Sequence, residues 1–245
     1  MTSTRLTRRA LVRVSATDDA EDPAAFLQGL LTNDVTGELP AYAALLTPQG
    51  KTMFDMVVWR DGGDIILDCE TEVAEDLAKR LSLYRLRCKL AIAVDDTLAV
   101  HWQKGPREGA SPDPRLPALG WRWLASTSDD SARADDAWRA HRLSCGVPEG
   151  SEELGDILWL ETNAVELHGV SFNKGCYIGQ ENTARMNWRQ KVNRRLIVVP
   201  LERSDEKRRK VAHEDLGLAI DHLRVADIPA DQVPDWLDLG ETESA

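Results

Sequence analysis

Apolar residues near the start of the chain recur at helical spacing. Asp22 followed by Pro23 is a typical N-cap and first-turn pair, because the carboxylate accepts from a free backbone N–H and proline fits the first turn. The apolar positions that follow have a helical period: Phe26, Leu27, Leu30 and Leu31. The pattern predicts a helix from about Pro23 toward Leu31.

Two more helices are predicted from capping residues and apolar faces. Thr71 is a candidate N-cap for a helix with acidic residues in its first turn and an apolar face made of Val73, Leu77 and Leu81. Ser131 is a candidate N-cap for a third helix, and Gly146 is placed to end that helix.

Short β-rich runs separated by turn residues predict a sheet. They cover residues 42–46, 53–59, 65–69, 91–94 and 98–102, with a hairpin signal at Asp61-Gly62-Gly63. Proline and glycine crowd residues 104–120, so we expect a surface loop there rather than a core element. Because strands and helices mix without strict alternation, the predicted fold class is α+β.

Near the C-terminus the composition changes. Residues 196–201 are strand-like, residues 202–210 are a charge run typical of a solvated hairpin or loop, and residues 216–225 offer one or two short β segments. We therefore expect two domains, a main one over residues 1–195 and a short C-terminal β appendage over residues 196–245.

The overall composition is that of a folded protein without disulfides. A chain of 245 residues with 42% hydrophobic content can bury a substantial core. The four cysteines show no CxxC pair, and neither they nor the five histidines have the spacing of a metal site. No stretch approaches the ~20 apolar residues of a membrane span, and no signal-peptide pattern follows the first arginines. We expect a cytoplasmic protein with no membrane partner.

Chemically reactive side chains concentrate in one octapeptide. Lys174-Gly175-Cys176-Tyr177-Ile178-Gly179-Gln180-Glu181 combines a cation, a thiol, a phenol, an amide and a carboxylate. Helical composition resumes at Gln180, so we expect Cys176 just before a helix N-terminus, where the helix dipole and Lys174 lower the pKa of a thiol. The alternative is an inert, buried cysteine that packs as a small hydrophobe.

A local excess of positive charge follows the same octapeptide. The formal net charge of -11 opposes nonspecific binding of polyanions over the whole surface. Between residues 174 and 195, however, Glu181 is the single acid against Lys174, Arg185, Arg189, Lys191, Arg194 and Arg195. Guanidinium groups suit carboxylates and phosphates, so this basic strip is a candidate site for an anionic ligand or an RNA backbone. A solvated basic helix face explains the same residues.

The run from Gly169 to Arg185 resembles the signature of the YgfZ-type folate-binding proteins. Three further blocks resemble the same family, namely Phe26–Val35, Leu46–Lys51 with Asp55, and Tyr84–Arg87, so the resemblance covers about residues 8–200. The wider superfamily includes the glycine-cleavage T-protein. The resemblance therefore implies ferredoxin-like units around a central folate pocket and a C-terminal β-barrel, for which residues 201–245 are short.

The resemblance also implies site residues and a cofactor, tetrahydrofolate or a one-carbon derivative. Asp55 falls where the T-protein has paired acids, one of which faces the folate N5 region, although its neighbour here is Phe54. Glu161 matches a glutamate that contacts the pterin, whose amino group and ring N–H suit a carboxylate. Either acid also fits a purely structural role. The remaining cofactor-binding candidates come from the signature: Lys174, Gln180, Glu181 and Arg185, with Cys176 as the catalytic thiol.

Three functions follow from the sequence. The first is a folate-binding accessory protein for assembly or repair of [4Fe-4S] proteins, including tRNA-modifying enzymes, with iron–sulfur client enzymes or cluster assembly proteins as partners. The second is a tetrahydrofolate-dependent, aminomethyltransferase-like one-carbon transferase. The third is a tRNA-contacting module that uses the strip from Arg185 to Arg195. The sequence leaves open whether any reaction is catalysed.

Overall fold

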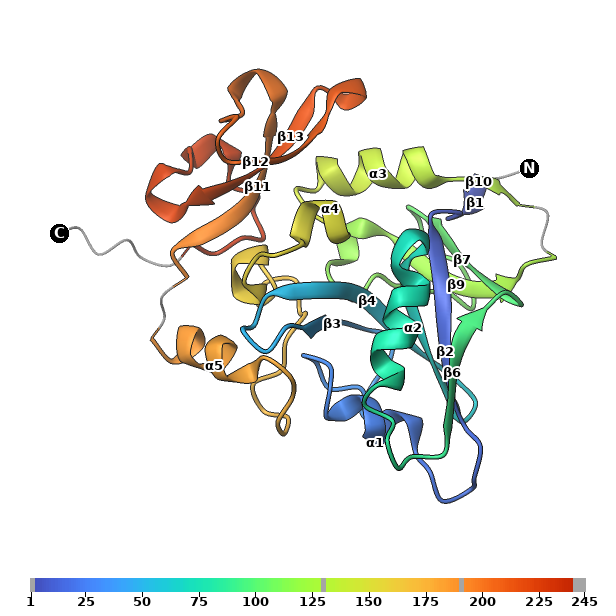
Figure 1. Cartoon of the computed structure of the whole chain (residues 1–245). Coiled ribbons are helices and arrows are strands. Elements are labelled where there is room, and N and C mark those ends of the chain that lie inside the picture. The colour runs from blue at the N-terminus through green and yellow to red at the C-terminus, as the bar shows by residue number, and fades with distance from the viewer. Residues whose placement is uncertain (1–2, 129–130, 190–191, 240–245) are drawn as a thin grey trace.

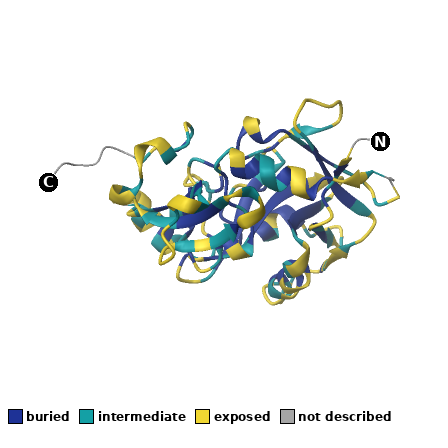
Figure 2. Cartoon of the chain, turned by 90° about the horizontal axis from the view of Figure 1, so that it is seen from above, coloured by how far each residue is buried: buried dark blue, intermediate teal, exposed yellow. Residues whose placement is uncertain are grey.

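The computed structural model describes residues 3–128, 131–189 and 192–239. Three sheets and a few short helices make up this part of the chain (Figure 1). Buried residues concentrate along the strands in the middle of the molecule, as Figure 2 shows. The mixed α and β architecture confirms the predicted fold class.

The central sheet combines two consecutive hairpins with two strands that are far apart in the sequence. It has the order β3-β4-β5-β2-β6 and comprises β2 (Arg9–Ala16), β3 (Ala41–Leu46), β4 (Thr52–Asp61), β5 (Asp64–Glu70) and β6 (Leu90–Asp95). The hairpins are β3–β4 and β4–β5, and the two distant strands are β2 and β6. Every neighbouring pair is antiparallel. At the β4–β5 turn Gly62 has φ 59°, a conformation that glycine adopts at little cost, which confirms the predicted hairpin.

Both faces of the central sheet are buried, so each strand has two buried sets of side chains. On one face Val58 and Leu67 pack with Leu27 and Leu77, from α1 (Pro23–Gln28) and α2 (Ala74–Ser82). The next residues along each strand point the opposite way. Val57 and Ile66 accordingly belong to the second core, with tryptophans of the following segment.

The second sheet covers that opposite face. Its order is β10-β1-β7-β9-β8, from β10 (Ala132–Arg133), β1 (Ser3–Arg5), β7 (Leu98–Gln103), β9 (Trp121–Ser126) and β8 (Ser111–Pro112). The helix α3 (Asp135–Ser144) packs beside it, and the rings of Trp138 and Trp102 meet edge to face with centroids 5.3 Å apart. Large aromatic side chains thus fill the space between the sheets.

The third sheet follows two more helices, α4 (Ser151–Leu154) and α5 (Gln180–Trp188). It has the antiparallel order β11-β13-β12, from β11 (Arg194–Pro200), β12 (Arg209–His213) and β13 (Leu218–Arg224). It lies at the upper left of Figure 1, and β12 contacts α4. A separate domain over residues 196–245 stays a prediction.

The first helix begins as predicted, but the second does not. Asp22 accepts a hydrogen bond from the Ala24 N–H at 2.8 Å, and α1 then ends at Gln28 rather than near Leu31. Thr71 is not a cap. Its hydroxyl donates to the carbonyl of Thr7, and it lies in a 3-10 turn that precedes α2.

The third helix begins later than its sequence suggested. Its N-cap position is Ala134, not Ser131, because Asp135 at the helix start accepts from the Arg8 N–H and the Thr7 hydroxyl. These contacts tie the helix start to the β1–β2 connection. Gly146, with φ 75°, follows the last turn as predicted.

Residues 104–120 are not simply a surface loop, contrary to the prediction. Asp113, Arg115 and Leu119 are only 2%, 1% and 0% exposed. Proline and glycine indicate the turns correctly. A buried ion pair between Arg115 and Asp113 anchors the loop in the core, and the proline and glycine content does not indicate that pair. No helix among the described residues has the length and apolar character needed to cross a membrane.

Candidate functional site

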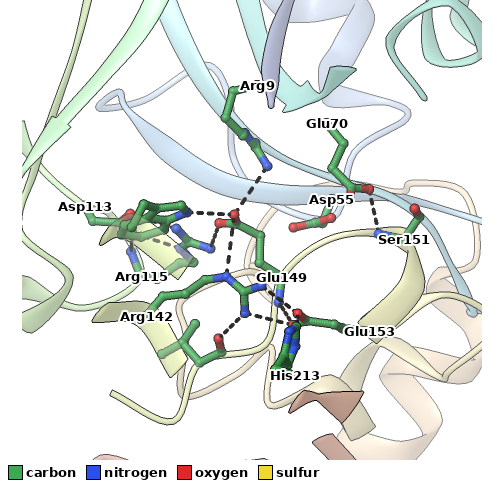
Figure 3. A network of polar contacts seen from close by, with 12 residues as sticks. Arg9, Asp55, Glu70, Asp113, Arg115, Arg142, Glu149, Ser151, Glu153 and His213 are labelled. Carbon is green, nitrogen blue, oxygen red and sulfur yellow. Dashed lines mark hydrogen bonds and ion pairs between the residues drawn. The ribbon is translucent and has the colours of Figure 1, made fainter. Parts of the chain in front are cut away.

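Four arginines and four carboxylates form a buried ionic network between the central sheet and α3, part of which Figure 3 shows. None of the eight side chains is more than 9% exposed. We call this set the arginine–carboxylate network: Arg9, Arg115, Arg122, Arg142, Asp68, Asp113, Glu149 and Glu153. Burial of so much charge requires each group to be paired, because an isolated buried ion is very costly.

Strand alternation brings the first members together. Asp68 of β5 points to the same face as Ile66, and its carboxylate accepts from Arg9 Nε at 2.6 Å and from Arg122 Nη1 at 3.0 Å. Arg122 comes from β9 of the second sheet, and its Nε lies 2.8 Å from Asp113 Oδ2. The pairs therefore join both sheets to the loop at residues 104–120.

Glu149 is the centre of the network. Its carboxylate accepts from Arg115 Nη1 at 2.6 Å and from Trp138 Nε1 at 3.0 Å, and Arg9 and Arg142 lie 3.7 and 3.9 Å away. Burial acts to raise the pKa of Glu149, but the surrounding guanidinium groups outweigh it and hold that pKa well below its usual value. Glu149 is therefore ionised at neutral pH.

Arg142 extends the network to the third sheet. It donates to both oxygens of Glu153, at 2.8 and 2.6 Å, and His213 of β12 lies 3.1 Å from the same carboxylate. Burial acts to raise the pKa of Glu153, yet Arg142 and His213 together lower it. A buried carboxylate thus links α3 and α4 to the C-terminal strands.

A cavity of about 430 Å³ opens beside this network. It is lined by both signs of charge, including Arg8, Arg9, Glu70, Arg139, Arg142, Glu149, Glu153 and His213. The buried Nη1 of Arg9 has no hydrogen bond to any described residue, and its nearest carboxylate, Glu149, is 3.7 Å away. An unused guanidinium donor at a polar cavity is the feature expected of a site for an oxygen-rich ligand.

Asp55, a predicted cofactor ligand, is not among the residues that line this cavity. It is 5% exposed on β4 and accepts from the Tyr42 hydroxyl at 3.1 Å. Burial raises the pKa of Asp55 to about 6, and Glu149 and Glu70 add to that effect, while Arg9 and Arg115 oppose it. Figure 3 shows its carboxylate near Glu70 and Arg9.

Glu161, the second predicted acid, lies elsewhere. It belongs to a 3-10 turn at Trp159–Thr162, and its carboxylate lies 2.9 Å from Nε2 of His222 on β13. Its side chain is 13% exposed, and it is not among the residues that line the cavity. The structure therefore does not bring Asp55 and Glu161 to one shared surface.

The signature lysine is fixed by backbone carbonyls. Lys174 Nζ donates to the carbonyls of Leu31 and Asn33, and it lies 5.2 Å from the centre of the Tyr177 ring. Burial lowers the pKa of Lys174 to about 8, although Asp34 acts in the opposite direction. The lysine thus ties the signature to the turn after α1.

Cys176 is exposed in the loop before α5. Gly179, the N-cap of that helix, has φ 81°, and a Cβ there would lie 2.6 Å from the carbonyl oxygen of Thr47. A glycine is therefore required for the loop to pack on the β3–β4 turn. Gln180 and Glu181 line an open groove with Pro48 and Tyr177, on the outside of the molecule.

The predicted basic strip is dispersed. Arg185 is exposed and pairs with Glu181 at 2.8 Å, whereas Arg195 is buried and donates to Glu166 at 2.8 Å. Lys174 is held inside the signature loop, and Lys191 lies outside the described residues. The six cations do not form one continuous surface among the residues described.

Sequence reasoning missed the arginine–carboxylate network. Arg122 stands between two tryptophans in a strand, and Arg9 opens a strand of buried residues, so both were charged residues at core positions. That pattern is a usable signal for buried ion pairs. Nothing local indicates which acid each arginine meets, because the partners are far apart in sequence. No group of metal-ligating side chains occurs in the described ranges.

Comparison with known proteins identifies relatives over most of the chain. The human mitochondrial iron–sulfur cluster assembly factor IBA57 is 35% identical over 236 residues, which cover 80% of this chain and 65% of the human protein. The mouse protein of that name is 35% identical over 242 residues and is covered to 66%. The Neurospora crassa homologue is 30% identical, with 52% of its length covered. The chain thus spans about half to two thirds of these relatives. No family model matches.

A solved structure shares the fold. The glycine cleavage system aminomethyltransferase T from Bartonella henselae superposes with a TM-score of 0.65 over 92% of this chain and 80% of that protein, at 11% sequence identity. At that identity the likeness establishes architecture alone. The expected T-protein fold is confirmed.

The comparisons also correct the expected location. The human, mouse and Neurospora crassa relatives are all named as mitochondrial proteins, so the prediction of a cytoplasmic protein is wrong. The sequence matches and the shared architecture agree on the relationship: this chain is a homologue of the IBA57 iron–sulfur cluster assembly factors, built on the fold of the glycine-cleavage T-protein.

Proposed function

We propose that this protein is a folate-binding accessory protein for the assembly or repair of [4Fe-4S] proteins. The observation that carries the proposal is the 35% identity over 236 residues to a relative named for iron–sulfur cluster assembly. The folate part of the proposal depends on the cavity beside the arginine–carboxylate network. In this proposal the partners are cluster assembly proteins or their client enzymes.

The donor set of the cavity suits a reduced folate. The pterin amino group and ring N–H need carboxylate acceptors, which Glu70 and Glu149 offer. The carboxylates of the folate tail need cations, which Arg8 offers together with Arg139, whose guanidinium also pairs with Asp215. The unused Nη1 of Arg9 supplies one more donor. A volume of about 430 Å³ also falls within the usual range for small-molecule sites.

In this proposal the predicted acids act indirectly. A bound tetrahydrofolate supplies a carrier for one-carbon units. Asp55 does not line the cavity but interacts electrostatically with Arg9 and Glu149, so it affects the charge of the cavity wall instead of touching the ligand. Glu161 positions His222 on the third sheet. Lys174 holds the signature loop, and Cys176 remains an accessible thiol for a partner.

Isothermal titration of tetrahydrofolate tests the cofactor. We expect the Arg8→Ala/Arg139→Ala variant to bind about a hundredfold more weakly or worse, because charged hydrogen bonds contribute about 1.5–3 kcal/mol each and the variant removes two cations. Arg60→Ala, which removes an exposed arginine of β4 that does not line the cavity, is the matched control. No binding by the unaltered protein removes the folate part of the proposal.

Client activity tests the cellular role. Deleting the gene should lower the activity of a [4Fe-4S] enzyme and the level of tRNA modifications made by [4Fe-4S] enzymes, and should spare a [2Fe-2S] enzyme. Cys176→Ala should reproduce part of the loss, whereas Cys88→Ala should not, since Cys88 packs against the apolar core. Normal client activity in the deletion strain contradicts the proposal.

The alternatives receive less support. A one-carbon transferase needs an acid at the reacting carbon, but Asp55 is buried and hydrogen-bonded to Tyr42, and Phe54 occupies the neighbouring position. A tRNA-contacting strip needs a continuous basic surface, and the described part of the strip is divided between buried and exposed cations. Both remain expectations from sequence only.

A further inference from the structure

The loop between α2 and β6 exposes three apolar side chains in four residues. Leu83 is 62% exposed, Tyr84 37% and Leu86 90%. This loop lies at the lower edge of the molecule in Figure 1, below α2. A single exposed leucine needs no explanation, but a cluster on one short loop is the usual mark of a contact surface.

Positive charge surrounds these apolar side chains. Between residues 79 and 89 there is no acid, and five cations occur: Lys79, Arg80, Arg85, Arg87 and Lys89. Lys79 and Lys89 pair with Asp76 and Asp18. Arg87 is exposed and makes no side-chain ion pair or hydrogen bond within the part of the chain that the structure describes, so its charge is available to a partner. The loop is thus locally basic in a chain of net charge -11.

The loop is ordered by its own backbone. The N–H of Tyr84 donates to the carbonyl of Leu81, and the N–H of Cys88 donates to the carbonyl of Arg85, both at 3.0 Å. The guanidinium of Arg85 also donates to the carbonyl of Leu90. Because its shape is already fixed, the loop can bind without a large loss of conformational entropy.

We propose that residues 83–87 are a docking loop for an acidic protein partner that presents an apolar recess ringed by carboxylates. Tyrosine and arginine are enriched at protein interfaces, and the two leucines need a pocket that removes their surface from water. Aliphatic tips gain little from nucleic acid, which binds through phosphates and base stacking. Arginine, here more frequent than lysine, also forms the better-defined pairs with carboxylates.

Site-specific photo-crosslinking in living cells tests this surface. A benzophenone amino acid in place of Leu86 should form an adduct with one protein, and the cross-linked peptide of that protein should contain Asp or Glu. Arg87→Glu should reduce the adduct at least tenfold, and replacement of the partner's acid by Lys should restore it. The same probe in place of Val165, which is 39% exposed in another part of the chain, is the control and should give no such adduct.

The readout in cells rests on the proposed function, and the two can fail separately. Leu86→Asp should leave the melting temperature unchanged and lower client [4Fe-4S] activity severalfold. If deletion of the gene lowers that activity but Leu86→Asp does not, the docking loop is wrong and the proposed function stands. If Arg87→Glu and the compensating Lys in the partner behave as expected but deletion of the gene has no effect, the docking loop stands and the proposed function is wrong. Adducts with RNA or lipid, or none, overturn the docking loop.

Discussion

Asp55 shows how burial can change the role of a single residue. Its position in the sequence matches a folate-site acid, but its carboxylate lies inside the core, with Tyr42 as hydrogen-bond donor and Arg9 and Glu149 nearby. Desolvation dominates over the nearby cations, so the pKa of Asp55 rises to about 6. The folded protein therefore binds this proton more tightly than the unfolded chain does.

The raised pKa of Asp55 predicts a pH-dependent stability. Its favourable contribution is complete below about pH 4 and is lost as the pH rises toward 6, because the unfolded chain loses its proton first. Asp55→Asn keeps an acceptor for Tyr42 and removes the charge. We expect the variant to gain on the order of 2 kcal/mol over the unaltered protein at pH 8 and little at pH 4. Urea denaturation at both pH values measures this, and an equal difference at both contradicts it.

Lys174 gives a second prediction at this scale. Burial lowers its pKa to about 8, so near pH 8 a larger fraction of this amine is neutral than for an exposed lysine. We expect acetic anhydride to modify Lys174 faster than Lys104, which is exposed, when both are followed by peptide mass spectrometry at pH 8. Slower modification of Lys174 would show that its carbonyl contacts protect it more than the lowered pKa activates it.

Among the elements, the signature loop depends on one close backbone contact. Gly179 has φ 81° and meets the β3–β4 turn, whereas a Cβ on Gly175 would touch nothing within 4 Å. Both glycines belong to the same octapeptide. Substitutions at these two glycines therefore form a matched comparison, which separates the effect of backbone packing from the effect of the chemistry of the octapeptide.

We expect Gly179→Ala to destabilise the protein by about 1–3 kcal/mol, because it adds strain at a positive φ and a clash with backbone atoms. Gly175→Ala should change the free energy of unfolding by less than about 0.5 kcal/mol. Chemical denaturation of the two variants compares them directly. Equal stabilities would mean that the loop can shift away from the β3–β4 turn.

The elements also show where sequence reasoning works and where it stops. Strands and the N-cap at Asp22 were predictable because alternation and capping are local signals. The cap at Thr71 was wrong, and the surface loop predicted over 104–120 is exposed without interruption only over its first part, residues 104–109. Tertiary partners decided both cases: Thr7 for the first and the Arg115 ion pairs for the second. The cavity brings together positions from residue 8 to residue 213, so no local pattern contains it.

For the molecule as a whole, the contact between α4 and the third sheet depends on a buried carboxylate. The Glu153 carboxylate accepts from Arg142 of α3 and also contacts His213 of β12. We expect Glu153→Ala to cost about 3–5 kcal/mol, because it leaves Arg142 buried without its main partner. Thermal and urea unfolding measure the loss. Glu152→Ala, one residue away on the cavity wall, is the control and should have a far smaller effect.

The balance of charge in the arginine–carboxylate network sets a rule for any ligand. Four guanidinium groups face four carboxylates, so the interior holds no spare positive charge. An anion that reaches Arg9 must share that guanidinium with Glu149. The affinity of the anion therefore depends on how much more strongly Arg9 attracts the anion than it attracts Glu149. Glu149 therefore competes with any anion for Arg9, and the carboxylates of a ligand bind better at Arg8, a cation of the cavity wall that lies outside the network.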